Sequence, residues 1–170
     1  MMKNKCLFIF GLLLISLSAS SAFAGGVRFN LLGTSELSQN SGATSAIGYG
    51  AGGSLEFKMG SAVGIEAGFI YTYRNMTQMG LTQGIYGDIP LVFRFYFGNI
   101  FSIGLGGFYE LPMDSVMVSY YGVTADITIR APLGPKAAFI LRPRYSYDLV
   151  NTGSNQLNFL SGIAGFQFGM

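Results

Sequence analysis

The residues that most often carry enzymatic chemistry are nearly absent from this sequence. It has 170 residues, no histidine and one cysteine, Cys6. Histidine is the usual general base near neutral pH, and the serine and aspartate residues lack such a partner for nucleophilic catalysis. Without histidine or a cysteine in the mature chain, a transition-metal site is not expected. The sequence therefore predicts no enzyme activity, no metal site and no cofactor.

One glycine-rich stretch has the spacing of a dinucleotide-binding motif. It runs from Gly48 to Gly53 and reads GYGAGG. That motif binds a pyrophosphate where it opens a helix in a βαβ unit, and no such unit is indicated here. We interpret the stretch as the glycine-rich start of a strand.

The charged residues are the remaining candidates, and their expected chemistry is pairing. Thirteen of them fall in segments where polar and apolar residues alternate, and all thirteen share one phase of the alternation. They are Arg28, Glu56, Lys58, Glu66, Arg74, Asp88, Arg94, Glu110, Asp126, Arg130, Arg142, Arg144 and Asp148. Glu36, Asp114 and Lys136 fall in expected connections instead.

The opposite phase is apolar and bulky, with Leu91, Phe93 and Phe95 at successive alternate positions. A soluble carrier barrel would turn this phase inward, whereas a membrane barrel would turn the charges inward. An eight-stranded barrel has an interior only just wide enough for side chains, so the phenylalanines would crowd it. Gly64 and Gly104 leave room among the charges. In a membrane, an arginine on the lipid face would cost roughly 2–4 kcal/mol. The charged phase is therefore predicted to face the lumen.

The alternation predicts an all-β fold, an eight-stranded antiparallel up-and-down transmembrane β-barrel. The strands are expected at 26–33, 48–59, 62–74, 84–97, 100–111, 118–130, 137–149 and 156–169. Long polar connections at 34–47, 75–83, 112–117 and 150–155 alternate with short ones at 60–61, 98–99 and 131–136. Such alternation is typical of outer-membrane barrels, with their short periplasmic turns and longer extracellular loops. Pro90 and Pro143 interrupt strands, so bulges are expected there.

The first residues have the three parts of a secretory signal in order. Lys3 and Lys5 precede an apolar run at 7–17, and 22–24 read Ala-Phe-Ala. We expect a signal peptide at 1–24 and one barrel domain at 25–170. Without the two signal lysines, eight basic residues balance eight acidic ones. A nucleic-acid partner is not expected, because that class shows a basic excess.

Aromatic residues of the apolar phase separate by type toward the two ends of the strands. Tyrosines lie toward the long connections, at Tyr49, Tyr71, Tyr73, Tyr109, Tyr121, Tyr145 and Tyr147. Phenylalanines, among them Phe57, Phe97, Phe166 and Phe168, lie toward the short turns. A tyrosine has an apolar ring and a polar tip, which suits a membrane–water boundary. We predict two membrane-interface girdles.

With these features the mature chain resembles the small eight-stranded outer-membrane β-barrels, the class of the OmpA transmembrane domain and OmpX. Residues 162–170, GIAGFQFGM, are similar to the terminal assembly signal of that class, with Met170 where phenylalanine is usual. The resemblance implies periplasmic chaperones, the barrel assembly machinery, and residence in the cell outer membrane against its lipid and lipopolysaccharide. It implies no particular activity, and the enzymes of the class use a histidine that this chain lacks.

We therefore expect a structural, non-enzymatic and monomeric outer-membrane protein with a plugged, charge-paired interior. Glu56, Glu66, Asp88 and Asp126 are expected to pair with Arg28, Lys58, Arg94 and Arg130, in combinations that the sequence leaves open. Isolated buried charges are costly, so pairing inside the lumen is required. A narrow or gated channel for small solutes is the first alternative. Surface binding through the extracellular loops is the second.

Overall fold

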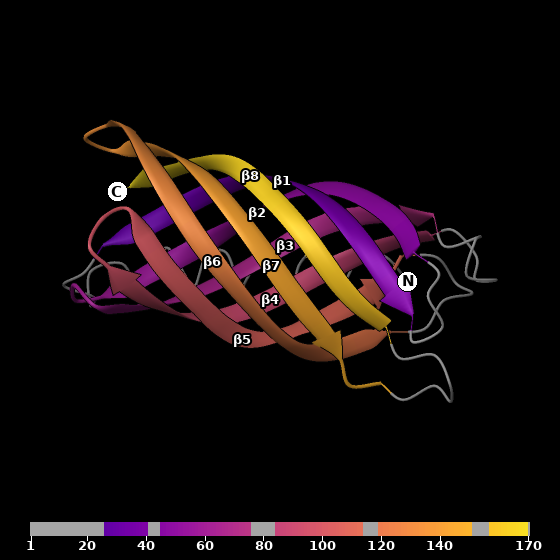
Figure 1. The fold of residues 1–170 in the computed structure, drawn as a ribbon. Coiled ribbons are helices and arrows are strands. Elements are labelled where there is room, and N and C mark those ends of the chain that lie inside the picture. The colour runs from indigo at the N-terminus through magenta and orange to yellow at the C-terminus, as the bar shows by residue number, and fades with distance from the viewer. Residues whose placement is uncertain (1–25, 41–44, 76–83, 114–118, 151–156, 170) are drawn as a thin grey trace, which may run out of the picture.

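Eight strands form one closed wall in the computed structural model (Figure 1). The structure describes residues 26–40, 45–75, 84–113, 119–150 and 157–169, so the expected signal peptide lies outside the described residues. The strands are β1 (Val27–Asn40), β2 (Ser45–Met59), β3 (Val63–Asn75), β4 (Gly84–Phe97), β5 (Phe101–Pro112), β6 (Tyr120–Gly134), β7 (Ala137–Asp148) and β8 (Leu157–Gly169). No helix within these ranges is long and apolar enough to cross a membrane.

Each strand pairs antiparallel with the next, and β8 returns to β1 to close the barrel. The closing ladder runs from Arg28 opposite Gly169 to Asn40 opposite Leu157. Closure leaves no unpaired edge, which removes the main hazard of a sheet this apolar. The predicted architecture, eight antiparallel strands in up-and-down order, is confirmed.

The three tight turns that join β2 to β3, β4 to β5 and β6 to β7 lie at one end of the barrel, on the left of Figure 1. Gly60 and Gly98 occupy two of them with φ of 80° and 74°, values that glycine adopts without steric cost. The first residue of β1 and the last of β8 lie at this end too. We call it the turn end, and the opposite end the loop end.

Two predicted connections are wrong because the strands run further than their composition suggests. β1 continues to Asn40 and β2 begins at Ser45, so most of the expected connection at 34–47 is strand. Its polar residues resemble a loop, but they pair in register with both β2 and β8. β6 likewise continues to Gly134 through most of the expected turn at 131–136, with a register shift between Pro132 and Gly134.

The bulges predicted at Pro90 and Pro143 are also wrong. Near Pro90 the pairing of β3 with β4 lacks two residue pairs but resumes in the same register, from Ala67 opposite Leu91 to Ile70 opposite Asp88. The ladder of β6 with β7 skips two pairs at Pro143 in the same way. Each proline lacks an N–H and therefore interrupts the ladder with one neighbour only. No extra residue is inserted, so the inward and outward phases continue past both prolines.

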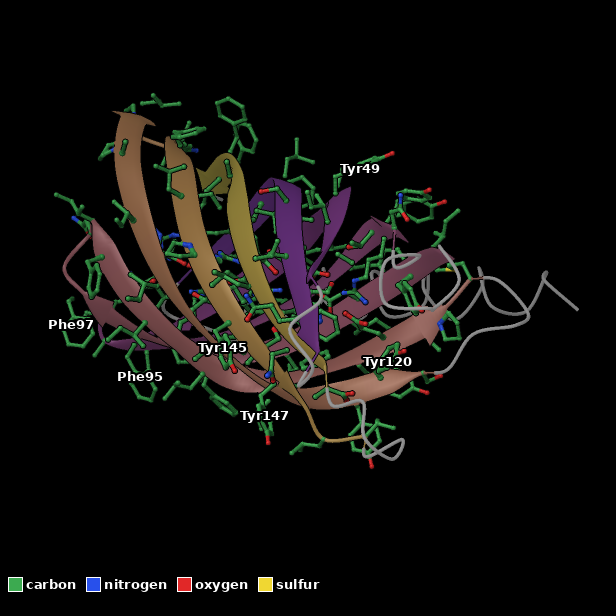
Figure 2. The ribbon with its side chains drawn as sticks, turned by 45° about the vertical axis from the view of Figure 1, so that its right-hand side comes forward. Tyr49, Phe95, Phe97, Tyr120, Tyr145 and Tyr147 are labelled. Atoms are coloured by element: carbon green, nitrogen blue, oxygen red, sulfur yellow. The ribbon has the colours of Figure 1, made fainter. Side chains whose placement is uncertain are left out.

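The two phases of the wall face opposite environments. In β4, Phe93 and Phe95 are 53% and 44% exposed on the outer surface, whereas Arg94 between them is fully buried inside. Figure 2 shows Phe95, Phe97 and Tyr147 pointing away from the barrel wall. The same alternation appears in every strand. The outer wall is consequently an apolar band.

Adjacent glycines in β5 provide a test of how closely the wall packs. A Cβ at Gly106 would lie 2.0 Å from the carbonyl oxygen of Leu91, whereas one at Gly107 would meet nothing closer than the carbonyl oxygen of Gly122 at 3.4 Å. We predict that Gly106→Ala lowers the free energy of unfolding by roughly 1–3 kcal/mol, the usual cost of overpacking. Gly107→Ala should change it by less than about 1 kcal/mol. Urea titration of the folded barrel in detergent micelles measures both. Equal midpoints for the two variants would contradict the strand spacing described here.

Candidate functional site

The lumen is the only place where the described residues bring many charged side chains together. All thirteen charges predicted to share one phase lie on the inward face of their strands. Glu36, which was placed in a connection, is a fourteenth, because β1 extends past it. That prediction was wrong, although Glu36 is an even number of positions from Arg28, which is the signal that could have found it. With Glu36 the lumen holds seven basic and seven acidic residues.

One group of ion pairs occupies the part of the lumen nearer the turn end. We call it the turn-side network, and its members are Arg28, Glu56, Glu66, Arg94, Asp126, Arg130 and Arg142. The strands that supply these side chains are β1 to β4, β6 and β7. The network therefore links strands from all around the wall.

Arg94 is the centre of the turn-side network. Its Nε donates to Glu66, and its Nη1 and Nη2 donate to the two oxygens of Asp126 at 2.8 and 3.0 Å. Nη1 also donates to the hydroxyl of Thr128 at 2.9 Å. Arg94 is fully buried, and Glu66 and Asp126 are 1% and 3% exposed. Paired, two-point contacts of this kind are among the stronger hydrogen bonds that proteins make.

Glu66 is shared by a second arginine. Arg142 donates from Nη1 to Glu66 at 2.8 Å and from Nε to Thr128 at 2.9 Å. The hydroxyl of Ser54 adds a hydrogen bond to Glu66 at 2.5 Å. With Asn30, which donates at 3.4 Å, this carboxylate accepts hydrogen bonds from four strands besides its own.

Glu56 accepts hydrogen bonds from the two arginines of the turn-side network that lie closest to the turn end. Arg28 and Arg130 donate to it at 3.0 and 3.2 Å, and Arg94 approaches it at 3.6 Å. Arg130 is held further by Ser102 at 2.9 Å and by Gln167 at 3.1 Å. One carboxylate thus neutralises part of the charge of three arginines.

A second group of charges lies toward the loop end. We call it the loop-side network, and its members are Glu36, Arg74, Asp88, Glu110 and Arg144. Arg74 sits between Glu36 and Glu110 and donates to both oxygens of each, with Nη2 3.0 Å from Glu36 and Nη1 and Nη2 2.5 Å from Glu110. The guanidinium carbon of Arg74 lies 4.3 Å from the ring centre of Phe159, within the range of a cation–π contact. A separate pair joins Arg144 to Asp88 at 3.4 Å.

Apolar side chains lie between the two networks on part of the wall. Leu32, Ile70, Ile140 and Ile163 form one buried cluster. On β1, Leu32 falls between Arg28 and Glu36, and on β3, Ile70 falls between Glu66 and Arg74. On β6 and β7 the two networks meet instead, because Asp126 lies directly opposite Arg144.

Aromatic side chains fill the lumen beside Arg74. Tyr86, Phe108, Tyr120 and Phe159 pack with Ala46 in a second buried cluster. The rings of Phe108 and Phe159 meet edge to face, with their centres 6.1 Å apart. None of these four aromatic residues was predicted from the sequence to face the interior. The available signal was their position, since each lies an even number of residues from a polar side chain that faces inward on the same strand.

The aromatic residues expected at membrane interfaces lie on the outer wall. Those that are more than a third exposed are Tyr49, Tyr71, Tyr109, Tyr121, Tyr145, Phe97, Phe166 and Phe168, and the partly exposed ones are Tyr73, Tyr147 and Phe57. Tyr49 and Tyr73 on neighbouring strands have ring centres 5.3 Å apart. Their placement leaves the phenolic groups near the loop end and the phenylalanines near the turn end.

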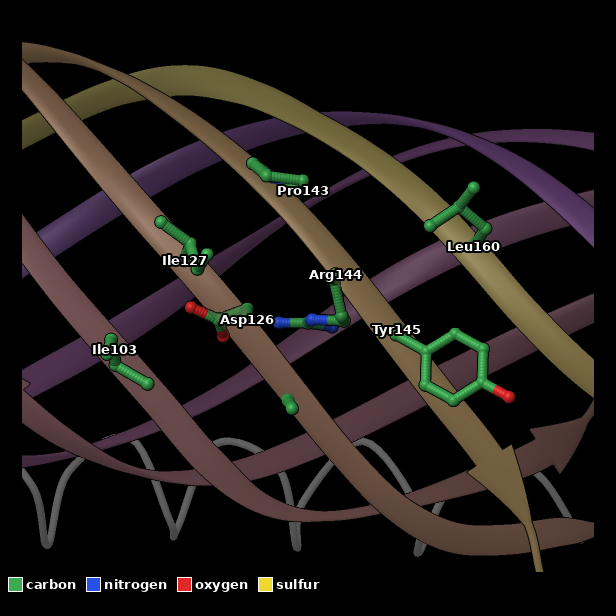
Figure 3. Close-up of a pocket in the computed structure, with 8 residues that line it drawn as sticks. Ile103, Asp126, Ile127, Pro143, Arg144, Tyr145 and Leu160 are labelled. Atoms are coloured by element: carbon green, nitrogen blue, oxygen red, sulfur yellow. The ribbon is translucent and has the colours of Figure 1, made fainter.

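The outer wall also has a hollow of about 320 Å³ beside Pro143 (Figure 3). Ile103, Ile127, Pro143, Tyr145 and Leu160, from β5 to β8, line it together with Ala125, Asp126 and Arg144. The carboxylate of Asp126 already accepts two hydrogen bonds from Arg94, so it is committed to an ion pair. In the described ranges no cluster of three or more acidic side chains could hold a metal ion.

Comparison with known proteins finds likeness in structure alone. No protein-family model and no curated protein sequence matches the chain. Among solved structures, Neisserial surface protein A aligns with a TM-score of 0.62 at 15% identity, over 85% of this chain and 97% of that protein. The outer membrane protein OprG of Pseudomonas aeruginosa gives 0.55 at 14% identity, over 87% and 97%. Ail, the attachment invasion locus protein of Yersinia pestis, gives 0.52 at 13%, over 85% and 99%. At such identities the likeness shows a shared fold.

The central position of Arg94 gives a stability prediction. Arg94→Gln removes the cation shared by Glu66 and Asp126, so both buried carboxylates lose a positively charged partner. We expect the free energy of unfolding to fall by about 3–5 kcal/mol, the usual cost of breaking a buried pair.

The matched control is Arg28→Gln. The side chain of Arg28 is 23% exposed, and its partner Glu56 keeps Arg130. That change should cost roughly 1 kcal/mol or less. Urea titration in micelles compares the two variants. If Arg28→Gln lowered the free energy of unfolding as much as Arg94→Gln does, Arg94 would not be the centre of the turn-side network.

Proposed function

We propose that this chain is a structural, non-enzymatic outer-membrane β-barrel whose lumen is closed by its own side chains. The observation that carries the proposal is the filled interior, in which two charge networks and two apolar clusters occupy the lumen. Eight strands enclose a space only just wide enough for side chains. Here seven basic and seven acidic residues, two apolar clusters and several hydroxyls occupy it.

The apolar outer band supports a place within a membrane. Leu91, Phe93, Ile127, Leu141 and Phe166 are all between 42% and 54% exposed on the outside of the wall. Apolar surface of this extent is unfavourable in water but favourable in lipid. The tyrosines at one rim and phenylalanines at the other fit the two interfaces of such a band.

The outer membrane is the membrane that fits this architecture. Bacterial barrels with even strand number, short turns on one side and longer connections on the other reside there. The expected signal peptide at 1–24, chaperoned transit and insertion by the barrel assembly machinery are the route that this residence requires. The proposed partners of the mature, monomeric barrel are membrane lipid and lipopolysaccharide.

A non-enzymatic role is supported by the chemistry of the lumen. Five of the seven lumen carboxylates of the described residues make two or more contacts with arginines, namely Glu36, Glu56, Glu66, Glu110 and Asp126. A carboxylate held in this way is a poor general base, because removing a proton from a substrate would break the ion pair. The hollow on the outer wall lacks a nucleophile paired with a base.

A leucine pair tests the membrane placement. Leu91 is 54% exposed in the middle of β4, and Leu133 is 61% exposed where β6 extends to the turn end. Leu91→Arg should destabilise the barrel in lipid vesicles by roughly 2–4 kcal/mol, and Leu133→Arg by about 1 kcal/mol or less. The folded fraction is read from the mobility difference between unboiled and boiled samples on a gel. Similar tolerance of both changes would contradict a membrane at the level of Leu91.

A conductance measurement tests the closed lumen. The wild-type barrel in a planar bilayer should show no steady ohmic current, because the buried apolar clusters and the paired arginines fill the lumen. A general porin recorded under the same conditions shows that the assay detects an open barrel. Stable current through the wild type would overturn the plug and favour a narrow or gated channel for small solutes.

A further inference from the structure

A pocket of about 300 Å³ opens at the turn end of the barrel. One wall is the β6–β7 hairpin, which reaches past the neighbouring strands at the upper left of Figure 1. The opposite wall comes from β1, the β4–β5 turn and β8. The polar side chains that line it are Arg28, Asn99, Arg130, Lys136 and Gln167.

The lining is basic and contains no carboxylate among the described residues. Arg28, Arg130 and Lys136 contribute three positive charges. The nearest acid is Glu56, which already accepts from Arg28 and Arg130 and lies 3.6 Å from Arg94. Its single negative charge therefore leaves the pocket with a positive excess.

A further cation raises this excess. The ammonium of Lys58 lies 4.7 Å from the ring centre of Tyr96, and Lys58 forms no ion pair with any described carboxylate. The guanidinium carbons of Arg130 and Arg28 lie 5.3 and 5.8 Å from the same ring. Three cations thus gather around one aromatic side chain. The turn-side network itself has four arginines against three carboxylates.

Arg28 has donors that no described residue accepts from. It donates from Nη1 to Glu56, and its Nε and Nη2 have no acceptor among the described residues. Arg130 is held in place by Ser102, Gln167 and Glu56. Binding at a side chain that is already ordered costs little conformational entropy. An arginine fork with free donors matches the oxygens of a phosphate.

We propose that this pocket binds a phosphate group, with Arg28 and Lys136 as its principal contacts and Arg130 fixing the depth of the site. The group belongs either to a soluble phosphate ester or to a phospholipid headgroup, since both present the same oxygens. In an outer-membrane barrel this mouth faces the periplasm, where both sources are within reach. The site is independent of whether the lumen conducts.

The test uses the whole folded barrel in maltoside micelles, which contain no phosphate. Inorganic phosphate, glycerol 3-phosphate and short-chain phosphatidylglycerol are added separately, and binding is measured by calorimetry and by amide shifts. Saturable binding that weakens with added salt is expected for at least one of them. Saturation by the soluble probes identifies a soluble ester as the source, and saturation by the lipid alone identifies the headgroup. Absence of saturable binding by all three would overturn the proposal.

Variants at the mouth separate a site from a general positive field. Lys136→Gln should weaken binding roughly tenfold, the value of one charge-assisted hydrogen bond. Asn99→Asp should weaken it by a similar factor, and Asn99→Lys should strengthen it. Ser61→Asp adds the same charge at an exposed position in another turn at this end, outside the pocket, and should leave affinity unchanged. Equal weakening by Ser61→Asp and Asn99→Asp would overturn a defined site.

A further titration tests whether a carboxylate of the chain itself occupies the pocket. Gly169 lines the pocket, and Met170 lies outside the described residues. The titration is therefore repeated with two serines added after Met170. Equal affinity for phosphate in both chains supports the proposal. Binding that appears only in the extended chain would overturn it, because a carboxylate of the chain would then be the natural occupant.

Discussion

The structure depends on the pairing of charges inside a space that eight strands leave only just large enough for side chains. A charge that faces this lumen has little water to stabilise it, so it needs an opposite charge and hydrogen bonds within reach. Arg94 and Arg74 meet that need with two carboxylates each. Because their partners lie on other strands, the same contacts that stabilise the charges also connect opposite sides of the wall.

The proposal of a closed lumen rests on how its side chains are packed. Leu32, Ile70, Ile140 and Ile163 form one apolar cluster, and aromatic rings pack beside Arg74. Ions would have to pass these clusters and displace arginines that hold two carboxylates. The interior is therefore better suited to fixing the shape of the barrel than to passing solutes, while the apolar outer band suits residence in lipid.

The charges are balanced over the whole lumen but not at each end. Basic residues outnumber acidic ones in the turn-side network, and the reverse holds around Arg74 and Arg144, which face Glu36, Asp88, Glu110 and Asp148. The excess at the turn end reaches the surface through Arg28, beside Lys136 and the β6–β7 hairpin. The proposed phosphate site at the mouth depends on this excess and not on an open lumen.

The sequence by itself determined the strand count, the closed architecture and the face on which thirteen of the fourteen lumen charges of the described residues lie. A strand has a period of two, so parity along the chain fixes inward and outward directions without any tertiary information. The tertiary structure determined which charges pair with one another, because parity along a strand does not fix contacts between strands. Arg142 and Glu66 are 76 residues apart, and Arg130 and Glu56 are 74 apart, so their contacts depend on the register and tilt of the closed wall.

Pairing of each strand with both neighbours also determined where the strands end. It keeps polar residues such as Glu36 and Ser38 within β1, and it maintains the register past Pro90 and Pro143. Local composition suggests a loop or a bulge at those positions, but a closed ladder leaves each strand a partner on both sides and so overrides that preference.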